Sequence, residues 1–136
     1  MLQSADRAMQ DFGDGGVVHY YDVNVGSCVF RNNRIESVTS SPYINENHGI
    51  YLDNSTEDCL VYDNVFYDIP SDSHAIWGNI GSGASNNNAY DNKIYDADCT
   101  IITNNWQPNN TASNNTREAE SDYPYLNVPR VTIISQ

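Results

Sequence analysis

Three segments of the chain decide its fold: "SCVFRNNRIESV" at residues 27–38, "DCLVYDNVFYDI" at residues 58–69 and "NNNAYDNKIYDA" at residues 86–97. Aligned with one another, they share an apolar residue, two further residues, an asparagine, one more residue and a second apolar residue. The shared asparagines are Asn33, Asn64 and Asn92, so the pattern advances by 31 and then by 28 residues. An internal repeat of this length is typical of solenoid proteins.

A second shared piece precedes each of these segments. Its copies are "GVVHYYD" at residues 16–22, "HGIYLDN" at 48–54, "HAIWGNI" at 74–80 and, as a fourth candidate, "DCTIITN" at 98–104. Each repeat therefore contains two or three short stretches of alternating polarity, broken by Asn, Asp, Gly and Ser, as in β-strands. One such unit cannot bury its own apolar face, whereas stacked units bury a continuous core.

The repeat predicts an all-β fold, a right-handed parallel β-helix of three to four coils. We expect a single domain over residues 1–136, with the coils at 14–105 and an irregular C-terminal segment at 106–136 that ends in a candidate last strand, "VPRVTIISQ". A small antiparallel sandwich is the alternative. It fits less well, because three copies agree at several positions and no Asn-Gly or Asp-Gly turn separates the strands. No cap is visible at either end, which suggests missing upstream coils, oligomerisation or a covering segment that the sequence does not reveal.

Alternation along the strands assigns the side chains. We expect an inward set and a ladder of stacked amides formed by Asn33, Asn64 and Asn92. The inward set is Ile50, Leu52, Val61, Phe66, Ile76 and Ile94, and Gly49, Tyr51 and Asp53 point outward. Cys28 and Cys59 share one register and are interpreted as stacked small core residues, because three cysteines do not suggest a disulfide framework.

The composition excludes several classes of protein. Asn is the most notable residue, with 19 copies in 136 positions, and Gly is also frequent, so a helical domain is excluded. A formal net charge of −12 disfavours nucleic acid, anionic membranes and polyuronates as partners. No apolar run is long enough for a membrane span, and the N-terminus shows no signal peptide. No metal or cofactor is expected, because neither CxxC spacing nor an acidic calcium loop is present.

The outward columns carry the candidate binding residues. The register places His19, Tyr51 and Trp77 in one column, and Tyr21, Asp53 and Asn79 in the next. His48 and His74 stand just before them, in line with Gly16. Aromatic rings stack on sugar C–H faces while amides and carboxylates bind hydroxyl groups, so this face suits a polysaccharide or oligosaccharide. The alternative is that Tyr and Trp simply favour strand surfaces.

Four of these motifs, in this order, resemble a known family. They are "DGG" at residues 14–16, "VFRNNRI" at 29–35, "HGIYLDN" at 48–54 and "VYDNVFY" at 61–67. The chain is similar, over about residues 11–95, to right-handed parallel β-helix glycosidases of the pectate-lyase-like superfamily, in the branch with α-L-fucosidase and xylanase activities. The chain departs from that pattern at Val17, where the family has a third Gly, and at Asn54, where it has a second acid. Because members of this family are several times longer, the chain resembles one segment of them.

The resemblance implies a function and a site. It implies glycoside hydrolysis by two catalytic carboxylates, which fall on Asp14 and Asp53, and an extracellular or cell-surface location. The alternative is a non-catalytic carbohydrate-binding or adhesive β-helix, such as part of a tailspike or surface protein. A polysaccharide lyase fits less well, because Arg31, Arg34 and Lys93 lie outside the aromatic column that would face the substrate.

Overall fold

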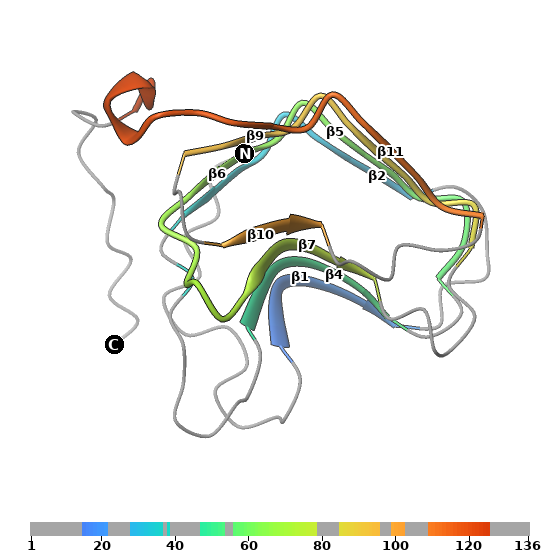
Figure 1. The fold of residues 1–136 in the computed structure, drawn as a ribbon. Helices are drawn as coiled ribbons and strands as arrows, with labels where there is room; N and C mark the ends of the chain where they lie inside the picture. The colour runs from blue at the N-terminus through green and yellow to red at the C-terminus, as the bar shows by residue number, and fades with distance from the viewer. Residues whose placement is uncertain are drawn as a thin grey trace.

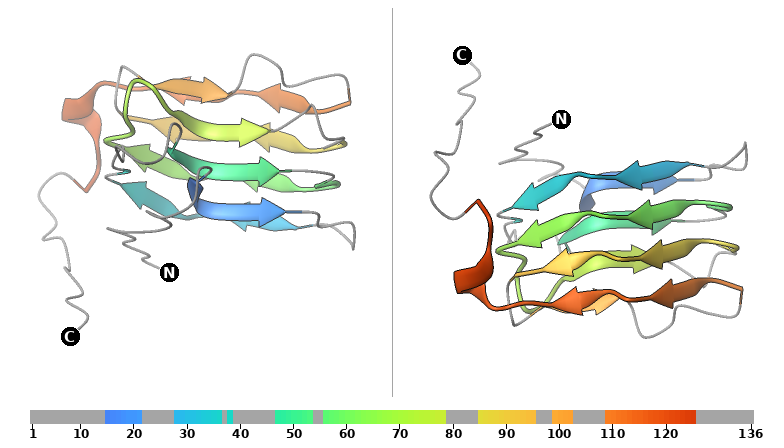
Figure 2. Two further views of the ribbon diagram at one scale, coloured as in Figure 1. Left: turned by 90° about the horizontal axis from the view of Figure 1, so that it is seen from below. Right: turned by 90° about the horizontal axis from the view of Figure 1, so that it is seen from above.

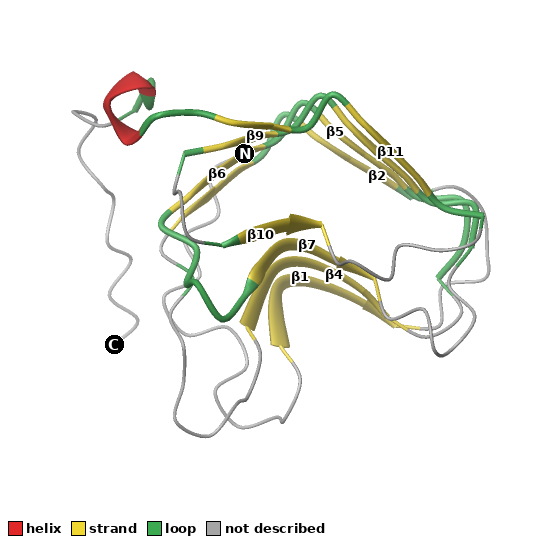
Figure 3. Ribbon diagram, in the orientation of Figure 1, coloured by secondary structure: helices red, strands yellow, loops and turns green. Residues whose placement is uncertain are grey.

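The computed structural model describes residues 15–21, 28–36, 38, 47–53, 56–78, 85–95, 99–102 and 109–125. Within these ranges the chain forms twelve short β-strands and one 3-10 helix (Figure 3). The elements are β1 (Gly15–Tyr21), β2 (Val29–Arg31), β3 (Arg34–Glu36), β4 (Asn47–Asp53), β5 (Leu60–Tyr62), β6 (Val65–Tyr67), β7 (His74–Gly78), β8 (Asn88–Tyr90), β9 (Lys93–Ile94), β10 (Thr100–Ile102), β11 (Thr111–Ser113), β12 (Thr116–Arg117) and η2 (Glu120–Asp122).

The strands form three parallel sheets that enclose one core (Figure 1). Sheet A has the order β1-β4-β7-β10, sheet B has β2-β5-β8-β11 and sheet C has β3-β6-β9-β12. Three consecutive strands make one coil, so β1–β3 form coil 1 and β10–β12 form coil 4. The coils advance in a right-handed sense, as the end view of Figure 1 and the side views of Figure 2 show together. The predicted parallel β-helix is confirmed.

The predicted core residues lie in the interior. Ile50, Leu52, Val61, Phe66, Ile76 and Ile94 are all fully buried. Their columns follow the strand register, in which Ile50 pairs with Ile76 and Phe66 pairs with Ile94. Stacking like residues from coil to coil removes their apolar surface from water. This burial stabilises the fold by roughly 25 cal/mol for each Å² of apolar surface.

The predicted asparagine ladder is present and longer than expected. Asn33 Nδ2 donates to Asn64 Oδ1 at 2.9 Å, Asn64 Nδ2 donates to Asn92 Oδ1 at 3.0 Å, and Asn92 Nδ2 donates to Asn115 Oδ1 at 2.8 Å. Each ladder residue follows a residue with positive φ: Asn32, Asp63, Asp91 and Asn114. Asn and Asp tolerate this left-handed conformation best among residues with a side chain. This tolerance explains why they recur in every coil at the corner between sheets B and C.

A second ladder lies at the corner between sheets A and B. The backbone N–H of Cys59 donates to Asn87 Oδ1 at 3.0 Å, and the backbone N–H of Asn87 donates to Asn110 Oδ1 at 2.8 Å. Asn87 Nδ2 also donates to the carbonyl of Thr56 at 2.9 Å. These bonds satisfy backbone groups that the turn leaves without a strand partner.

The expected outward orientation of Gly49 is wrong. A Cβ atom added to Gly49 would lie 2.5 Å from the carbonyl oxygen of Ala75 and 2.8 Å from the Phe66 ring, so this position faces the core. Gly49 and Ile50 therefore both face inward, and the alternation of β4 slips by one residue between them. The slip accompanies the sharp bend of the sheet A strands in Figure 1. Only glycine allows so close an approach to the neighbouring backbone.

Cys28 and Cys59 form a disulfide between coils 1 and 2, which corrects the interpretation of this pair as free core residues. The shared register was predicted correctly, since the bond joins equivalent positions of adjacent coils with Cα atoms 4.5 Å apart. The odd cysteine count was misleading because the third cysteine, Cys99, is buried and takes no part in a disulfide.

The coils continue beyond the expected boundary at residue 105. Strands β11 and β12 pair with β8 and β9 and extend the repeat to Arg117. Residues 118–125 then turn back along the solenoid beside sheet C (Figure 2). The side chain of Tyr123 contacts three coils. Its hydroxyl accepts a hydrogen bond from Arg34 Nε at 2.9 Å. The centroid of its ring lies 4.3 Å from that of Tyr67 and 5.2 Å from that of Tyr95.

Candidate functional site

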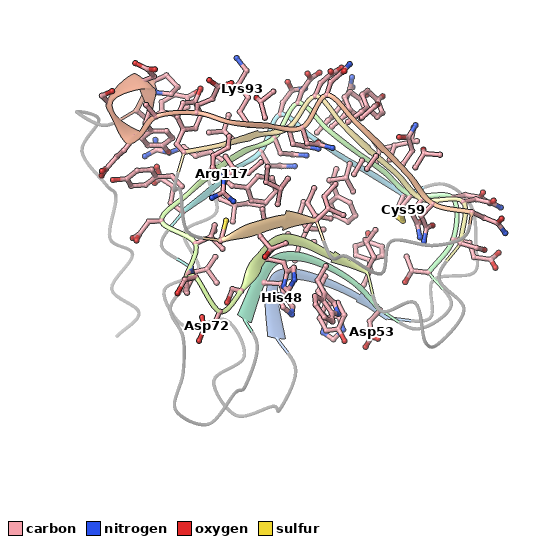
Figure 4. All side chains as sticks on the ribbon, in the orientation of Figure 1. His48, Asp53, Cys59, Asp72, Lys93 and Arg117 are labelled. Carbon is pink, nitrogen blue, oxygen red and sulfur yellow. A yellow bond between two sulfur atoms is a disulfide. The ribbon has the colours of Figure 1, made fainter. Side chains whose placement is uncertain are left out.

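The candidate site lies on the outer face of sheet A (Figure 4), where the predicted columns are found. His19 pairs with Tyr51 in the strand register, and Tyr51 pairs with Trp77. Tyr21 pairs with Asp53, and Gly16 pairs with His48. The side chain of Tyr21 and the whole of Asn79 lie outside the described residues, so their predicted roles stay predictions.

The bend at Gly49 explains how His48 reaches this face. With strict alternation, His48 would share the inward orientation of Ile50, two positions later. Because the alternation slips at Gly49, His48 lies on the outer side together with Tyr51, three positions later. Figure 4 shows His48 and Asp53 on the side of sheet A away from the core.

The rings of this face form one connected cluster. His19 stacks on Tyr51 with ring centroids 4.6 Å apart and planes 5° from parallel, and His48 stacks on Trp77 at 4.7 Å and 2°. His74 meets His48 and Trp77 edge to face, at 5.2 and 4.4 Å. We call these five residues together with Asp53 the sheet A cluster. All three histidines of the chain belong to it.

The members of the cluster differ in exposure, which the sequence did not predict. Tyr51 retains only 5% of its accessible surface and His48 is fully buried, because neighbouring rings cover them. His19, His74 and Trp77 are partly exposed. A ligand on this face would therefore contact the three partly exposed side chains, while Tyr51 and His48 support them from within.

The carboxylate of Asp53 interacts with the column beside it. His19 Nε2 lies 3.3 Å from Asp53 Oδ2, and Asp53 is only 4% exposed. The two residues are diagonal neighbours across the β1–β4 pair, since His19 stands two positions before the partner of Asp53. Long side chains reach one another over this diagonal. Although the register contained this signal, the pairing was not predicted.

Thr56 fixes the strand end that carries Asp53. Its hydroxyl donates to the carbonyl of Asp53 and lies 3.2 Å from the carbonyl of Tyr20, and the side chain is fully buried. Thr56 was also missed. Its signal is weak, since a single hydroxyl after a strand is common in turns.

Two of the three imidazoles in the cluster have lowered pKa values. Burial lowers the pKa of His48 to about 3, with smaller contributions from the neighbouring His74 and His19. Burial also lowers the pKa of His74. The backbone N–H of His74 donates to His48 Nδ1 at 3.3 Å, which requires an unprotonated nitrogen at that position.

The described cationic side chains lie on other parts of the solenoid. They belong to β2, β3, β9 and β12 and are Arg31, Arg34, Lys93 and Arg117. On the described part of sheet A, Asp53 is thus the only Asp, Glu, Lys or Arg residue. No three His, Cys, Asp or Glu side chains among the described residues are arranged to hold a metal ion. No helix within the described ranges is long and apolar enough to cross a membrane.

The second predicted catalytic residue, Asp14, lies outside the described residues. Gly15, which follows it, pairs with Asn47 at the start of β4, six positions before Asp53. Six residues of a straight strand span roughly 20 Å. A catalytic pair of Asp14 and Asp53 therefore requires the bend of β1 and β4 to bring the two strand ends closer together.

Comparison of the chain with protein-family models, with curated proteins and with solved structures finds no match.

Proposed function

We propose that this chain is a carbohydrate-active β-helix protein whose sheet A cluster binds a polysaccharide or oligosaccharide. One observation carries the proposal: the six side chains of the cluster lie in contact with one another on one outer face. Tyr51 contacts the rings of His19 and Trp77, and His19 contacts the carboxylate of Asp53. His48 and His74 both contact the Trp77 indole. Sugar rings offer apolar C–H faces and a rim of hydroxyl groups. This cluster offers aromatic surface next to hydrogen-bonding groups, which are the complementary features.

The arrangement favours binding because the exposed rings are held in place beforehand. His48 covers one face of the Trp77 indole, and His74 meets its edge. Tyr51 supports the His19 ring in the same way. Side chains that are already fixed lose little conformational entropy when a ligand binds, so more of the contact energy appears as affinity.

The charge distribution favours a neutral glycan. The cluster carries one carboxylate, and no described Lys or Arg lies on this face. Burial lowers the pKa of His48 to about 3 and also lowers that of His74, which disfavours a positive charge on either imidazole. A uronate or sulfated chain would bring further negative charge toward Asp53 without a cation to compensate for it. We therefore expect neutral chains such as arabinoxylan to bind more tightly than acidic ones.

Hydrolysis is the second candidate function, because the cluster places one carboxylate, that of Asp53, beside the partly exposed His19 ring. A glycosidase needs an acid that protonates the leaving oxygen and a carboxylate that acts as base or nucleophile. The resemblance to β-helix glycosidases assigns these roles to Asp14 and Asp53. The low exposure of Asp53 favours the non-catalytic form of the proposal, since a reacting carboxylate must reach the substrate.

Binding is tested by fluorescence in a Trp106→Phe background, where Trp77 is the remaining tryptophan. Neutral xylo-oligosaccharides should quench or shift its emission. The variants His19→Ala and His74→Ala should weaken binding at least about fivefold. Tyr62→Ala is the matched control, because Tyr62 stacks on Tyr90 at 4.8 Å in the same manner but belongs to sheet B. A folded protein that shows no change at millimolar concentrations of a panel of neutral sugars would contradict the proposal.

A second experiment separates charge preference and hydrolysis from binding itself. Homogalacturonan in its fully methyl-esterified and de-esterified forms offers the same backbone with and without charge, and the esterified form should bind more tightly. Release of reducing ends from any bound glycan, abolished by Asp53→Asn and by Asp14→Asn, would support hydrolysis. Binding without release of reducing ends would support the non-catalytic form.

A further inference from the structure

Two inward columns of the solenoid, those of sheets B and C, lose their large apolar side chains in coil 4. The column of Ile35, Phe66 and Ile94 continues in register to Arg117. The column of Phe30, Val61 and Ala89 continues to Ala112. In these two columns the first three coils contribute apolar side chains, whereas coil 4 contributes a methyl group and a guanidinium. The column of sheet A stays apolar, since Ile50 and Ile76 continue to Ile102. The residues of β11 and β12 are also exposed, in contrast to the buried core beneath them.

The side chain of Arg117 lies across the end of the core. Its Nη2 atom donates to the carbonyl oxygen of Cys99, which precedes β10 on the opposite wall of the same coil. Figure 4 shows Arg117 pointing from sheet C into the cross-section of the solenoid. Arg117 itself stays exposed, so water still solvates the rest of the guanidinium.

We propose that Arg117 closes the C-terminal end of the core and prevents a second copy of the chain from stacking on coil 4. Within the described residues, β10, β11 and β12 are the last strands of their sheets. The edge of a sheet is a template for another strand, and three such edges are a template for another coil. A copy stacked head to tail would make a non-closing contact of the kind that produces filaments. Such a copy would bury the guanidinium against an apolar interior, where the described structure provides one carbonyl as partner. Burial of a charge without full compensation is strongly unfavourable.

The decisive variant is Arg117→Leu, which restores an apolar residue to the column of Ile35, Phe66 and Ile94. We expect it to self-associate at concentrations at least about tenfold lower than the wild type, as measured by sedimentation velocity over a hundredfold concentration range. Arg117→Lys keeps the charge and should sediment as the wild type does. Lys93→Leu is the matched control: it makes a similar change one coil earlier in sheet C, at an exposed position beside the inward-facing Ile94.

A crosslink locates the contact. Arg31, Tyr62, Tyr90 and Ser113 occupy one outward column, so head-to-tail stacking would place Ser113 of one copy beside Arg31 of the next. Arg31→Cys combined with Ser113→Cys should give intermolecular disulfides when Arg117→Leu is also present, and not without it. If Arg117→Leu fails to fold, Arg117→Gln removes the charge without adding apolar surface and should associate in the same way.

Three results would overturn the proposal. The first is a folded Arg117→Leu or Arg117→Gln variant that sediments as the wild type does. The second is equal association by Lys93→Leu, which would attribute the effect to surface hydrophobicity. The third is a wild-type protein that already forms the Arg31–Ser113 crosslink.

Discussion

Asn64 and Asn92 lie 28 positions apart in the sequence, and the side-chain Nδ2 of Asn64 donates to Oδ1 of Asn92 at 3.0 Å in a fully buried corner. The Oδ1 atom of Asn64 also accepts hydrogen bonds from the backbone N–H and the side-chain Nδ2 of Asn33, and its Nδ2 donates to the carbonyl of Phe30. One side chain thus satisfies polar groups from two coils. Buried polar groups without a partner cost about 1–3 kcal/mol each, so this corner depends on every member of the ladder.

Replacement of Asn64 by Ala should lower the free energy of unfolding by about 2–4 kcal/mol, because the N–H of Asn33 and the carbonyl of Phe30 lose their partner in a buried site. Urea denaturation followed by circular dichroism measures the change. Asn88→Ala is the control, since Oδ1 of Asn88 makes no hydrogen bond within the described structure. Equal losses in both variants would contradict a special role for the ladder.

Gly49→Ala should destabilise the protein by about 2 kcal/mol or more, because the new Cβ atom would overlap the Phe66 ring and the carbonyl of Ala75. It should also change the emission of Trp77 in the Trp106→Phe background, because the bend at Gly49 positions His48 against the indole. Ile50→Val, at the next position, should cost only about 0.5–1.5 kcal/mol and leave the emission unchanged. A Gly49→Ala variant as stable as the wild type would mean that the strand can pass this point without the bend.

These two residues also show how far the sequence predicts the structure. Asn64 was placed correctly because a fixed position in a repeat constrains all copies together, and the same logic gave the inward and outward columns. The orientation of Gly49 could not be predicted, since it depends on Phe66 from another strand and on a break in alternation that the apolar pattern does not reveal. The roles of Arg117 and Tyr123 escaped prediction for a related reason: both lie after the last clear copy of the repeat, so no aligned position indicated their partners.

Tyr123→Ala should lower the free energy of unfolding by about 3 kcal/mol, because a buried ring that contacts Tyr67 and Tyr95 is lost together with the hydrogen bond from Arg34. Tyr123→Phe removes only the hydroxyl group and should cost about 1–2 kcal/mol. Tyr125→Ala is the control, since that neighbouring tyrosine is 39% exposed whereas Tyr123 is 4% exposed. A loss below about 1 kcal/mol for Tyr123→Ala would show that residues 118–125 do not stabilise the coils.

The disulfide between Cys28 and Cys59 predicts a definite labelling pattern. Under denaturing conditions without reductant, iodoacetamide should modify only Cys99, whereas reduction beforehand should expose all three thiols. Intact mass spectrometry counts the labels. Because the bond closes a loop of about thirty residues, its reduction should lower stability by roughly 3.7 kcal/mol in the chain-entropy description. Three labels without reductant would show that the cysteines are stacked but not bonded.

Acid should destabilise the protein through His48. Its pKa is lowered to about 3 in the folded state by burial, against an ordinary value of 6.5. The unfolded chain therefore binds a proton at this residue below about pH 6.5, while the folded chain does not until about pH 3. The contribution of His48 to stability is fully present above pH 6.5. As the pH falls toward 3, this contribution decreases by up to about 1.4 kcal/mol per pH unit.

The variant His48→Gln isolates this contribution from that of the many carboxyl groups, which titrate in both proteins. Free energies of unfolding measured at pH 7, 6, 5 and 4 should fall more steeply for the wild type than for His48→Gln, and the difference between the two curves should narrow as the pH decreases. The pKa of His74 is lowered by burial as well, so His74→Gln should reduce the slope in the same direction. Parallel curves for the wild type and His48→Gln would mean that water reaches the imidazole, and that the stack of His48 on Trp77 opens more readily than the geometry of the cluster implies.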